Sequence, residues 1–200
     1  AKLCNIFSTE FIVETADSES GKKYKQVFKK NMSEKGDPVI TSWTREDFTK
    51  ITFKPDLRKF GMTEMDDDIV DLFKKRVYDM AGCCKDVKVF LNGERIKVKG
   101  FKQYVELYTK KPADSTAPEA THPIVYECAG ERWEVCCTVS DGQFQQVSFV
   151  NSINTYKGGT HVNHVTDQIV SEIIAAAGKK NKSLPLKPFQ VKNHIFIFIN

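Results

Sequence analysis

The spacing of apolar residues in the first sixty positions predicts short helices and strands in alternation. Leu3, Ile6 and Phe7 have the spacing of a helical turn, and residues 10–16 have the composition of a strand. Residues 22–32 place several apolar side chains on one helical face among lysines, which predicts a basic amphipathic helix that ends before Gly36-Asp37-Pro38. Residues 40–43 and 50–54 predict two strands that pair across a turn at 45–47.

The next forty residues carry two strong local signals. A helix is predicted from Thr63 to Ala81, with Thr63 and Asp66 spaced as a capping box and Gly82 as the stop. Asn92-Gly93 between two apolar runs predicts a β-hairpin with a type I′ turn. Residues 100–108 form a mixed aromatic and apolar segment, and the proline-containing stretch 110–122 predicts a surface loop.

The C-terminal half has the pattern strand, strand, helix, strand. Residues 133–139 and 143–150 predict a hairpin across Asp141-Gly142, and residues 161–177 predict an amphipathic helix. Ile195–Ile199 is apolar on both faces, which is typical of a central strand. We therefore expect two α+β units that meet near residue 100.

Composition narrows the class of protein only slightly. Hydrophobic residues make up 40% of the 200 residues and charged residues 28%, and the net charge of +4 permits a nucleic-acid partner without requiring one. The six cysteines include two adjacent pairs and no C-x-x-C, which indicates small buried residues in a reducing compartment. No apolar run is long enough to cross a membrane, so no membrane partner is expected. A first residue other than Met and a last residue directly after an apolar strand indicate a piece of a longer protein.

Residues 152–162 contain a candidate anion site beside a simpler explanation. The strand end, Gly158-Gly159 and Thr160 could present free amides at a helix start to a phosphate, but a strand-to-helix turn needs the same glycines. His161 and His164 lie on one helical face without a third metal ligand, so capping or packing is expected and no metal site is predicted. Neither a P-loop nor a G-x-G-x-x-G motif is present.

Two basic segments are candidates for nucleic-acid contact. The first contains Lys179, Lys180 and Lys182, followed by Lys187 and Lys192, and could contact a phosphate backbone or form a solvated loop. The second is the lysine-rich stretch 22–30, for which a solvated helix face is the stronger expectation.

Several segments resemble the eukaryotic type II DNA topoisomerases, in order along the chain. AKLCNIFSTEF at 1–11 is similar to the end of the ATP lid of that family, and ITFKPDLRKF at 51–60 to the strand that follows. Other similar segments are DVKVFLNG at 86–93, FQQVSFVNSI at 144–153, KGGTHV at 157–162 and FQVKNHI at 189–195. KGGTH is also similar to a turn of bacterial gyrase.

The resemblance implies both a fold and a parent enzyme. The fold is α+β: the end of a GHKL-type ATPase α/β sandwich over residues 1–98, then a ribosomal-protein-like transducer domain with a β-α-β crossover over 99–200. The parent is a nuclear, homodimeric, ATP-dependent DNA topoisomerase that passes one DNA duplex through a transient double-strand break in another. This segment is expected to couple ATP binding to gate closure. The catalytic and Mg²⁺-binding residues of the family are expected outside it.

Site residues follow from the same resemblance, position by position. Ala1 and Lys2 match the end of the lid that wraps the triphosphate, and Thr49 matches a strand threonine that offers its hydroxyl to the nucleotide, with an ordinary sheet threonine as the alternative. Lys179 and Lys180 match a segment that contacts DNA, in which Gly178 occupies the first of three positions that are usually basic. The competing hypothesis is a non-enzymatic domain of similar fold that binds nucleic acid or a protein partner.

Overall fold

The computed structural model describes residues 2–109, 122–180 and 185–200. The chain divides into two compact units, Ala1–Val70 and Asp71–Asn200, each with its own internal contacts. The division into domains at residue 98 stays a prediction.

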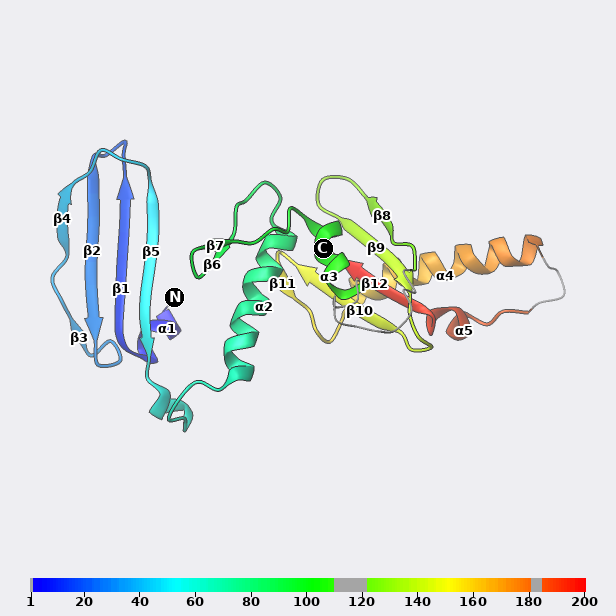
Figure 1. The fold of residues 1–200 in the computed structure, drawn as a ribbon, viewed down its shortest axis with the longest axis horizontal. Coiled ribbons are helices and arrows are strands. Elements are labelled where there is room, and N and C mark those ends of the chain that lie inside the picture. The colour runs from blue at the N-terminus through cyan, green and yellow to red at the C-terminus, as the bar shows by residue number, and fades with distance from the viewer. Residues whose placement is uncertain (1, 110–121, 181–184) are drawn as a thin grey trace. The chain divides into compact units, whose positions relative to one another are not determined.

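The first unit is an antiparallel sheet with a short helix before it (Figure 1). Its strands lie in the order β3-β2-β1-β5, with β4 also paired to β2. Its elements are α1 (Lys2–Ile6), β1 (Ser8–Asp17), β2 (Lys22–Lys29), β3 (Glu34–Lys35), β4 (Val39–Ser42), β5 (Phe48–Pro55) and a 3₁₀ turn, η1 (Leu57–Phe60). The short N-terminal helix and the strand after it were both predicted, and both are confirmed.

The basic stretch 22–32 is a strand, so the predicted amphipathic helix is wrong. β2 pairs antiparallel with β1 along its whole length, from Asp17↔Lys22 to Glu10↔Lys29. The strand ends where Lys30, Asn31 and Met32 take positive φ angles. The pattern of apolar and basic residues in this stretch is compatible with either a strand or a helix. Backbone hydrogen bonds to β1 favour the strand.

The two strands predicted at 40–43 and 50–54 exist, but they do not pair with each other. β4 pairs with β2, and β5 pairs with β1 on the other side of the sheet. The turn between them therefore crosses from one edge of the sheet to the other. Local sequence predicts the strands, whereas their pairing depends on residues at least fourteen positions away.

The second unit begins with a helix and a hairpin. α2 spans Asp67–Cys83, β6 and β7 are Phe90–Leu91 and Glu94–Arg95, and α3 spans Phe101–Thr109. The hairpin is confirmed, because Asn92 and Gly93 have φ angles of 52° and 85°, as a type I′ turn requires.

The predicted ends of α2 are wrong at both termini. Asp66 alone caps the helix, its Oδ1 accepting a hydrogen bond of 2.9 Å from the Ile69 amide, so the helix begins at Asp67 and not at Thr63. Gly82 lies inside the last turn and is buried. Its role is to let Tyr104 pack closely, since an added Cβ would meet the Tyr104 ring at 2.6 Å.

The rest of the second unit is a five-stranded sheet in the order β11-β10-β12-β9-β8. Its elements are β8 (Val125–Cys128), β9 (Glu134–Val139), β10 (Gln145–Val150), β11 (Ile153–Asn154), α4 (Thr160–Lys180), α5 (Pro188–Lys192) and β12 (Ile195–Ile199). The helix predicted at 161–177 is confirmed as α4. Most of the loop predicted at 110–122 lies outside the described residues.

β12 lies at the centre of this sheet, as predicted, and its position overturns the predicted hairpin of β9 and β10. β12 pairs antiparallel with β9 and parallel with β10, so it separates them. The parallel pairing makes β10-α4-β12 the expected β-α-β crossover. Ile197, Phe198 and Ile199 are at most 1% exposed, which explains why this strand takes the central place.

The two faces of the sheet pack into two apolar clusters. One face packs Phe198, Cys136 and Phe149 against Phe101, Tyr104 and Val105 of α3 and its start. The other packs Ile195, Ile197 and Ile199 against Val162 and Val170 of α4. Cys136 and Cys137 fall on opposite faces, as their adjacency in a strand predicts, and all six cysteines are free thiols. Among the residues described, no helix has the length and apolar character needed to span a membrane.

Candidate functional site

The candidate nucleotide contacts lie in the first unit, and Lys2 occupies the start of α1. Ala1 lies outside the described residues. Lys2 is exposed on a five-residue helix, which ends where the Ser8 hydroxyl donates a hydrogen bond of 2.6 Å to the Cys4 carbonyl. The ammonium group of Lys2 therefore projects into solvent, where an anionic ligand can reach it.

Thr49 lies in β5 with its side chain exposed. Its Oγ1 is 3.1 Å from Oγ1 of Thr15, directly opposite it in the register of β1 and β5. Thr15 also donates a hydrogen bond of 3.1 Å to the carbonyl of Phe48. Thr49 is therefore held by its neighbour and keeps hydrogen-bonding capacity for a ligand.

The structure does not bring Lys2 and Thr49 together. α1 precedes the Ser8 end of β1, which pairs with Pro55, whereas Thr49 pairs with Thr15 near the other end. Pro55 lies six positions after Thr49 in β5, which is about 20 Å at roughly 3.3 Å per residue. Lys2, in α1, and Thr49, in β5, therefore lie towards opposite ends of the β1–β5 pair and do not form a single pocket.

The described residues offer no obvious set of metal ligands. Across residues 2–109, 122–180 and 185–200, no group of three or more His, Cys, Asp and Glu side chains could hold an ion. Lys2 and Thr49 present an ammonium group and a hydroxyl to solvent.

The Gly158-Gly159 turn is built into a hydrogen-bond network inside the second unit. The hydroxyl groups of Ser148 and Thr155 are 2.5 Å apart, and Thr155 Oγ1 is 3.3 Å from Nε2 of His161. Gln146 donates a hydrogen bond of 3.0 Å to the Tyr156 carbonyl. Gly158 has a φ of 72°, so the turn needs glycine there on conformational grounds alone. The packing role expected for His161 agrees with these contacts.

The candidate DNA contacts, Lys179 and Lys180, form the last turn of α4. Both are exposed, and neither ammonium has an ion-pair partner among the residues that the structure describes. Positive charge at a helix C-terminus is stabilised by the helix dipole. The two lysines are therefore available to a phosphate backbone, whereas Lys182 lies outside the described residues.

Lys192, a later lysine of this basic group, differs from Lys179 and Lys180 because it contacts other side chains of the second unit. Its Nζ lies 5.0 Å from the centre of the Phe144 ring and 4.0 Å from Asp167. These contacts make the Lys192 ammonium group less available to a phosphate backbone. Of the described lysines in this predicted basic group, Lys179, Lys180 and Lys187 are exposed.

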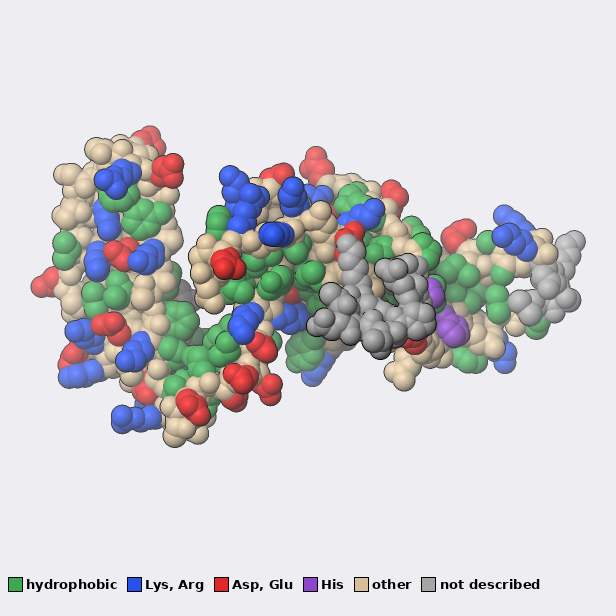
Figure 2. All heavy atoms as spheres, in the orientation of Figure 1, with side chains coloured by type: hydrophobic (Ala, Val, Ile, Leu, Met, Phe, Trp, Pro, Cys, Tyr) green, Lys and Arg blue, Asp and Glu red, His purple; other side chains and the backbone are tan. Residues whose placement is uncertain are grey.

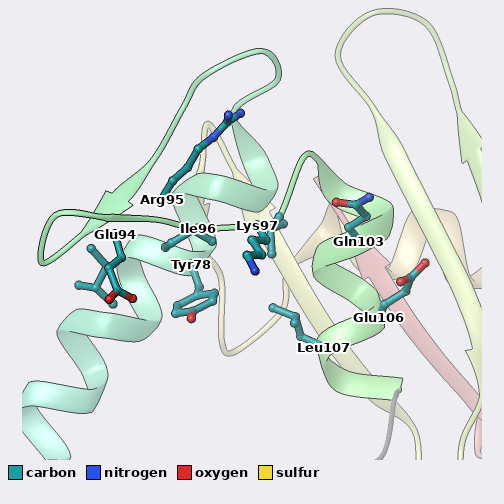
Figure 3. Close-up of a pocket in the computed structure, with 10 residues that line it drawn as sticks. Tyr78, Glu94, Arg95, Ile96, Lys97, Gln103, Glu106 and Leu107 are labelled. Atoms are coloured by element: carbon teal, nitrogen blue, oxygen red, sulfur yellow. The ribbon is translucent and has the colours of Figure 1, made fainter.

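A cavity of about 800 Å³ in the second unit contains none of the predicted site residues (Figure 3). Tyr78 comes from α2, Glu94 to Val98 from β7 and the segment after it, and Gln103, Glu106 and Leu107 from α3. Its lining mixes both signs of charge with apolar side chains. No pattern in the sequence predicts this cavity, because it forms only where residues of α2, β7 and α3 line one space.

Comparison with known proteins gives the family. The DNA gyrase B family model matches residues 100–200, and DNA topoisomerase 2 of Arabidopsis thaliana is 57% identical over all of this chain and 14% of its own length. The chain belongs to the DNA gyrase B and type II DNA topoisomerase family. DNA topoisomerase 2-alpha of Gallus gallus is 54% identical over the whole chain and 13% of that protein. The chain thus spans about one seventh of the length of these relatives.

Solved structures of the family confirm the fold. The ATPase region of Saccharomyces cerevisiae topoisomerase II matches with a TM-score of 0.85 and 51% identity, over 100% of this chain and 50% of that one. The ATPase and transducer domains of Balamuthia mandrillaris topoisomerase II match with a TM-score of 0.86 and 40% identity over the same shares. The family resemblance and the α+β fold class expected from the sequence are therefore both confirmed.

Proposed function

We propose that this chain is part of an ATP-dependent type II DNA topoisomerase that passes one DNA duplex through a transient double-strand break in another. The observation that carries the proposal is similarity over the whole chain, at 57% and 54% identity, to proteins named DNA topoisomerase 2. The structural match to an ATPase region supports the assignment of this segment to nucleotide use. Similarity of this extent to enzymes favours this function over a separate binding domain.

Within the enzyme, the segment couples ATP binding to closure of a DNA gate. Residues 1–98 complete the ATP-binding domain and residues 99–200 belong to the transducer. The β10-α4-β12 unit supports this role, because α4 and β12 share a buried apolar cluster and can move as one body. The parent is a homodimer in the nucleus, and its partner is double-stranded DNA.

ATP with Mg²⁺ is the cofactor of the parent enzyme. In this chain Ala1, Lys2 and Thr49 contact the nucleotide, through backbone amide, ammonium and hydroxyl groups respectively. Lys2 and Thr49 are exposed, and the Lys2 ammonium and the Thr49 hydroxyl can donate hydrogen bonds to phosphate and hydroxyl oxygens of a nucleotide. The metal is held by residues outside this segment.

The isolated chain is expected not to hydrolyse ATP at a measurable rate. The resemblance places the general base and the γ-phosphate lysine outside residues 1–200, so transition-state stabilisation is lost. A phosphate-release assay with the purified chain and Mg²⁺-ATP tests this, with calorimetric titration for binding. Robust phosphate release, or ATP binding in the micromolar range, would contradict the expectation.

Replacing Lys179 and Lys180 by alanine is expected to weaken binding of duplex DNA. Each phosphate neutralised contributes about 0.9 to the slope of log affinity against log salt, so two lost contacts reduce the slope by up to about 2. Fluorescence anisotropy of a labelled duplex across a salt series measures the slope. An unchanged slope would show that the two lysines are solvated at the end of α4 and do not contact DNA.

A further inference from the structure

One face of the sheet in the first unit carries five lysines on β2 and β5, the two strands that flank β1. In the register of β1 with β2 and β5, Lys25 and Lys50 lie opposite Glu14, while Lys29 and Lys54 lie opposite Glu10. Side chains two residues apart on a strand share a face, which adds Lys23 to the same side. We call this surface the lysine face, defined by Lys23, Lys25, Lys29, Lys50 and Lys54. Figure 2 shows these strands with blue side chains spread over the side turned to the viewer and red ones among them.

Glu14 lies at the centre of the lysine face and is closely surrounded. Its carboxylate oxygens are 3.4 Å from Lys23 Nζ, 3.8 Å from Lys25 Nζ and 4.0 Å from Lys50 Nζ. Desolvation raises the pKa of Glu14, but the hydrogen bond from Lys23 and the three positive charges outweigh it and leave the pKa below its usual value. Three glutamates, Glu10, Glu14 and Glu34, share the face with five lysines, so positive charge remains in excess.

The lysines of this face differ in how freely they reach solvent. The side chain of Lys23 is 27% exposed, and its Nζ also lies 5.6 Å and 5.5 Å from the ring centres of Trp43 and Phe48. Lys25 and Lys50 are 46% and 65% exposed. Lys23 is therefore engaged inside the unit, whereas Lys25 and Lys50 flank the central glutamate with ammonium groups open to a partner.

The opposite face of the same sheet has a different character. Phe11, Val13, Ile51 and Phe53 lie there, and Ile51 and Phe53 remain 45% and 48% exposed. Covering apolar side chains is favourable, whereas burying a group of lysines carries a desolvation cost of several kcal/mol per unpaired charge. A second layer of protein would therefore cover the apolar face, and the lysine face would remain in solvent.

We propose that the lysine face is a binding surface for the phosphate backbone of duplex DNA, separate from the lysines at the end of α4. Duplex DNA carries one negative charge per about 1.7 Å of its axis, which complements a broad array of ammonium groups. Lysine contacts phosphate as a point charge on a flexible stem, so the contact needs no fixed register. It is independent of base sequence. The inference rests on the proposed function only in taking DNA as the partner.

Replacing Lys25 and Lys50 by glutamine is expected to reduce the salt slope of duplex binding by up to about 1.8, at about 0.9 per lost phosphate contact. The measurement is anisotropy of a fluorescein-labelled 20-base-pair duplex with the 200-residue chain over a series of salt concentrations. The matched control is Lys22→Gln with Lys35→Gln. It removes the same charge from the opposite face, where these lysines lie opposite Asp17 and Phe28, and its slope is expected to match that of the unaltered chain.

A second variant tests the surface without removing a lysine. Glu14→Gln removes the central negative charge, so binding of the duplex is expected to tighten at low salt. This variant also carries the test if the double lysine variant fails to fold, as circular dichroism would show. Unchanged affinity for Glu14→Gln would overturn the proposal.

Two further outcomes separate the possible causes of failure. If Lys179→Ala with Lys180→Ala lowers the slope while Lys25→Gln with Lys50→Gln does not, the lysine face is not a DNA surface and the proposed function stands. If the Lys25 and Lys50 variant instead loses binding of a poly-glutamate peptide and keeps its binding of DNA, the partner is an acidic protein segment. That result would also overturn the proposal.

Discussion

Replacing Gly82 by alanine is expected to lower the free energy of unfolding of the second unit by about 2 kcal/mol. The new Cβ would lie 2.6–2.8 Å from three atoms of Tyr104, which is closer than non-bonded carbon atoms approach each other in proteins. Overpacking of this kind costs up to about 3 kcal/mol, whereas alanine in place of a helical glycine gains about 1 kcal/mol. The loss therefore exceeds the gain.

Tyr104 cannot move aside, which is why the clash is costly. Its ring is 1% exposed and lies between the rings of Phe101, Phe149 and Tyr108, at centroid distances of 6.2, 5.7 and 5.4 Å. Its hydroxyl donates a hydrogen bond of 2.6 Å to Asp79. A shift of the ring would disturb all of these contacts.

The matched control for this prediction is Gly178→Ala in α4. Among the described residues, no atom lies within 4 Å of the position that its Cβ would take, so helix propensity dominates and stability is expected to rise by at most about 1 kcal/mol. Urea denaturation followed by Trp133 fluorescence, in a Trp43→Phe background, reports on the second unit. Equal stability of Gly82→Ala and the unaltered chain would contradict the packing described here.

Replacing Asp79 by alanine is expected to lower the free energy of unfolding by about 3 kcal/mol. The Asp79 side chain is 2% exposed, and its two oxygens are each 2.9 Å from Nζ of Lys75. Burial and the Asp79 hydrogen bond raise the pKa of Tyr104, so Tyr104 stays a protonated donor that needs an acceptor. Removal of the carboxylate leaves the Tyr104 hydroxyl with only the Tyr108 hydroxyl, 2.8 Å away, as a hydrogen-bond partner, and it takes this partner from Lys75, which costs about 2–4 kcal/mol.

Asp71→Ala provides the comparison for a solvent-exposed pair. Asp71 lies 2.8 Å from Lys74 on the same helix, but its side chain is 69% exposed, so a change below about 0.5 kcal/mol is expected. The same denaturation experiment measures both variants. Similar losses for Asp71→Ala and Asp79→Ala would show that burial of the Asp79 pair contributes nothing.

Local signals in the sequence were sufficient for the elements whose structure is local. Asn92-Gly93 predicted its hairpin because only a few residue types tolerate positive φ at both turn positions, and the apolar spacing of 161–177 predicted α4. The apolar character of Ile195–Ile199 likewise predicted a central strand.

Elements whose partners are distant in the chain were predicted poorly. The apolar spacing of residues 22–32 predicts a helix. That spacing does not reveal that β1 lies alongside and pairs with this segment through backbone hydrogen bonds. The predicted β9–β10 hairpin failed because β12, more than forty residues later, enters between the two strands. Gly82 was assigned to a helix end although its small size serves contact with Tyr104.

The candidate site residues came from the family resemblance and not from any local pattern. Lys179 and Lys180 are as exposed as a DNA contact requires, but exposure alone does not distinguish them from a solvated helix end. The lysine face was hidden by the wrong helix prediction, because only the strand register places Lys25 and Lys50 on the two sides of Glu14. The register of β1 with β2 and β5 therefore makes the lysine face a candidate binding surface, which a helix over 22–32 would not form.

The most direct test of the proposed function is a decatenation assay on the protein that carries this sequence. Interlinked circles of duplex DNA are incubated with the purified protein and Mg²⁺, with and without ATP. We expect release of separate circles only with ATP, and slower release when Lys179 and Lys180 are replaced by alanine. A folded protein that binds DNA but separates no circles in the presence of ATP would contradict the assignment to a type II topoisomerase.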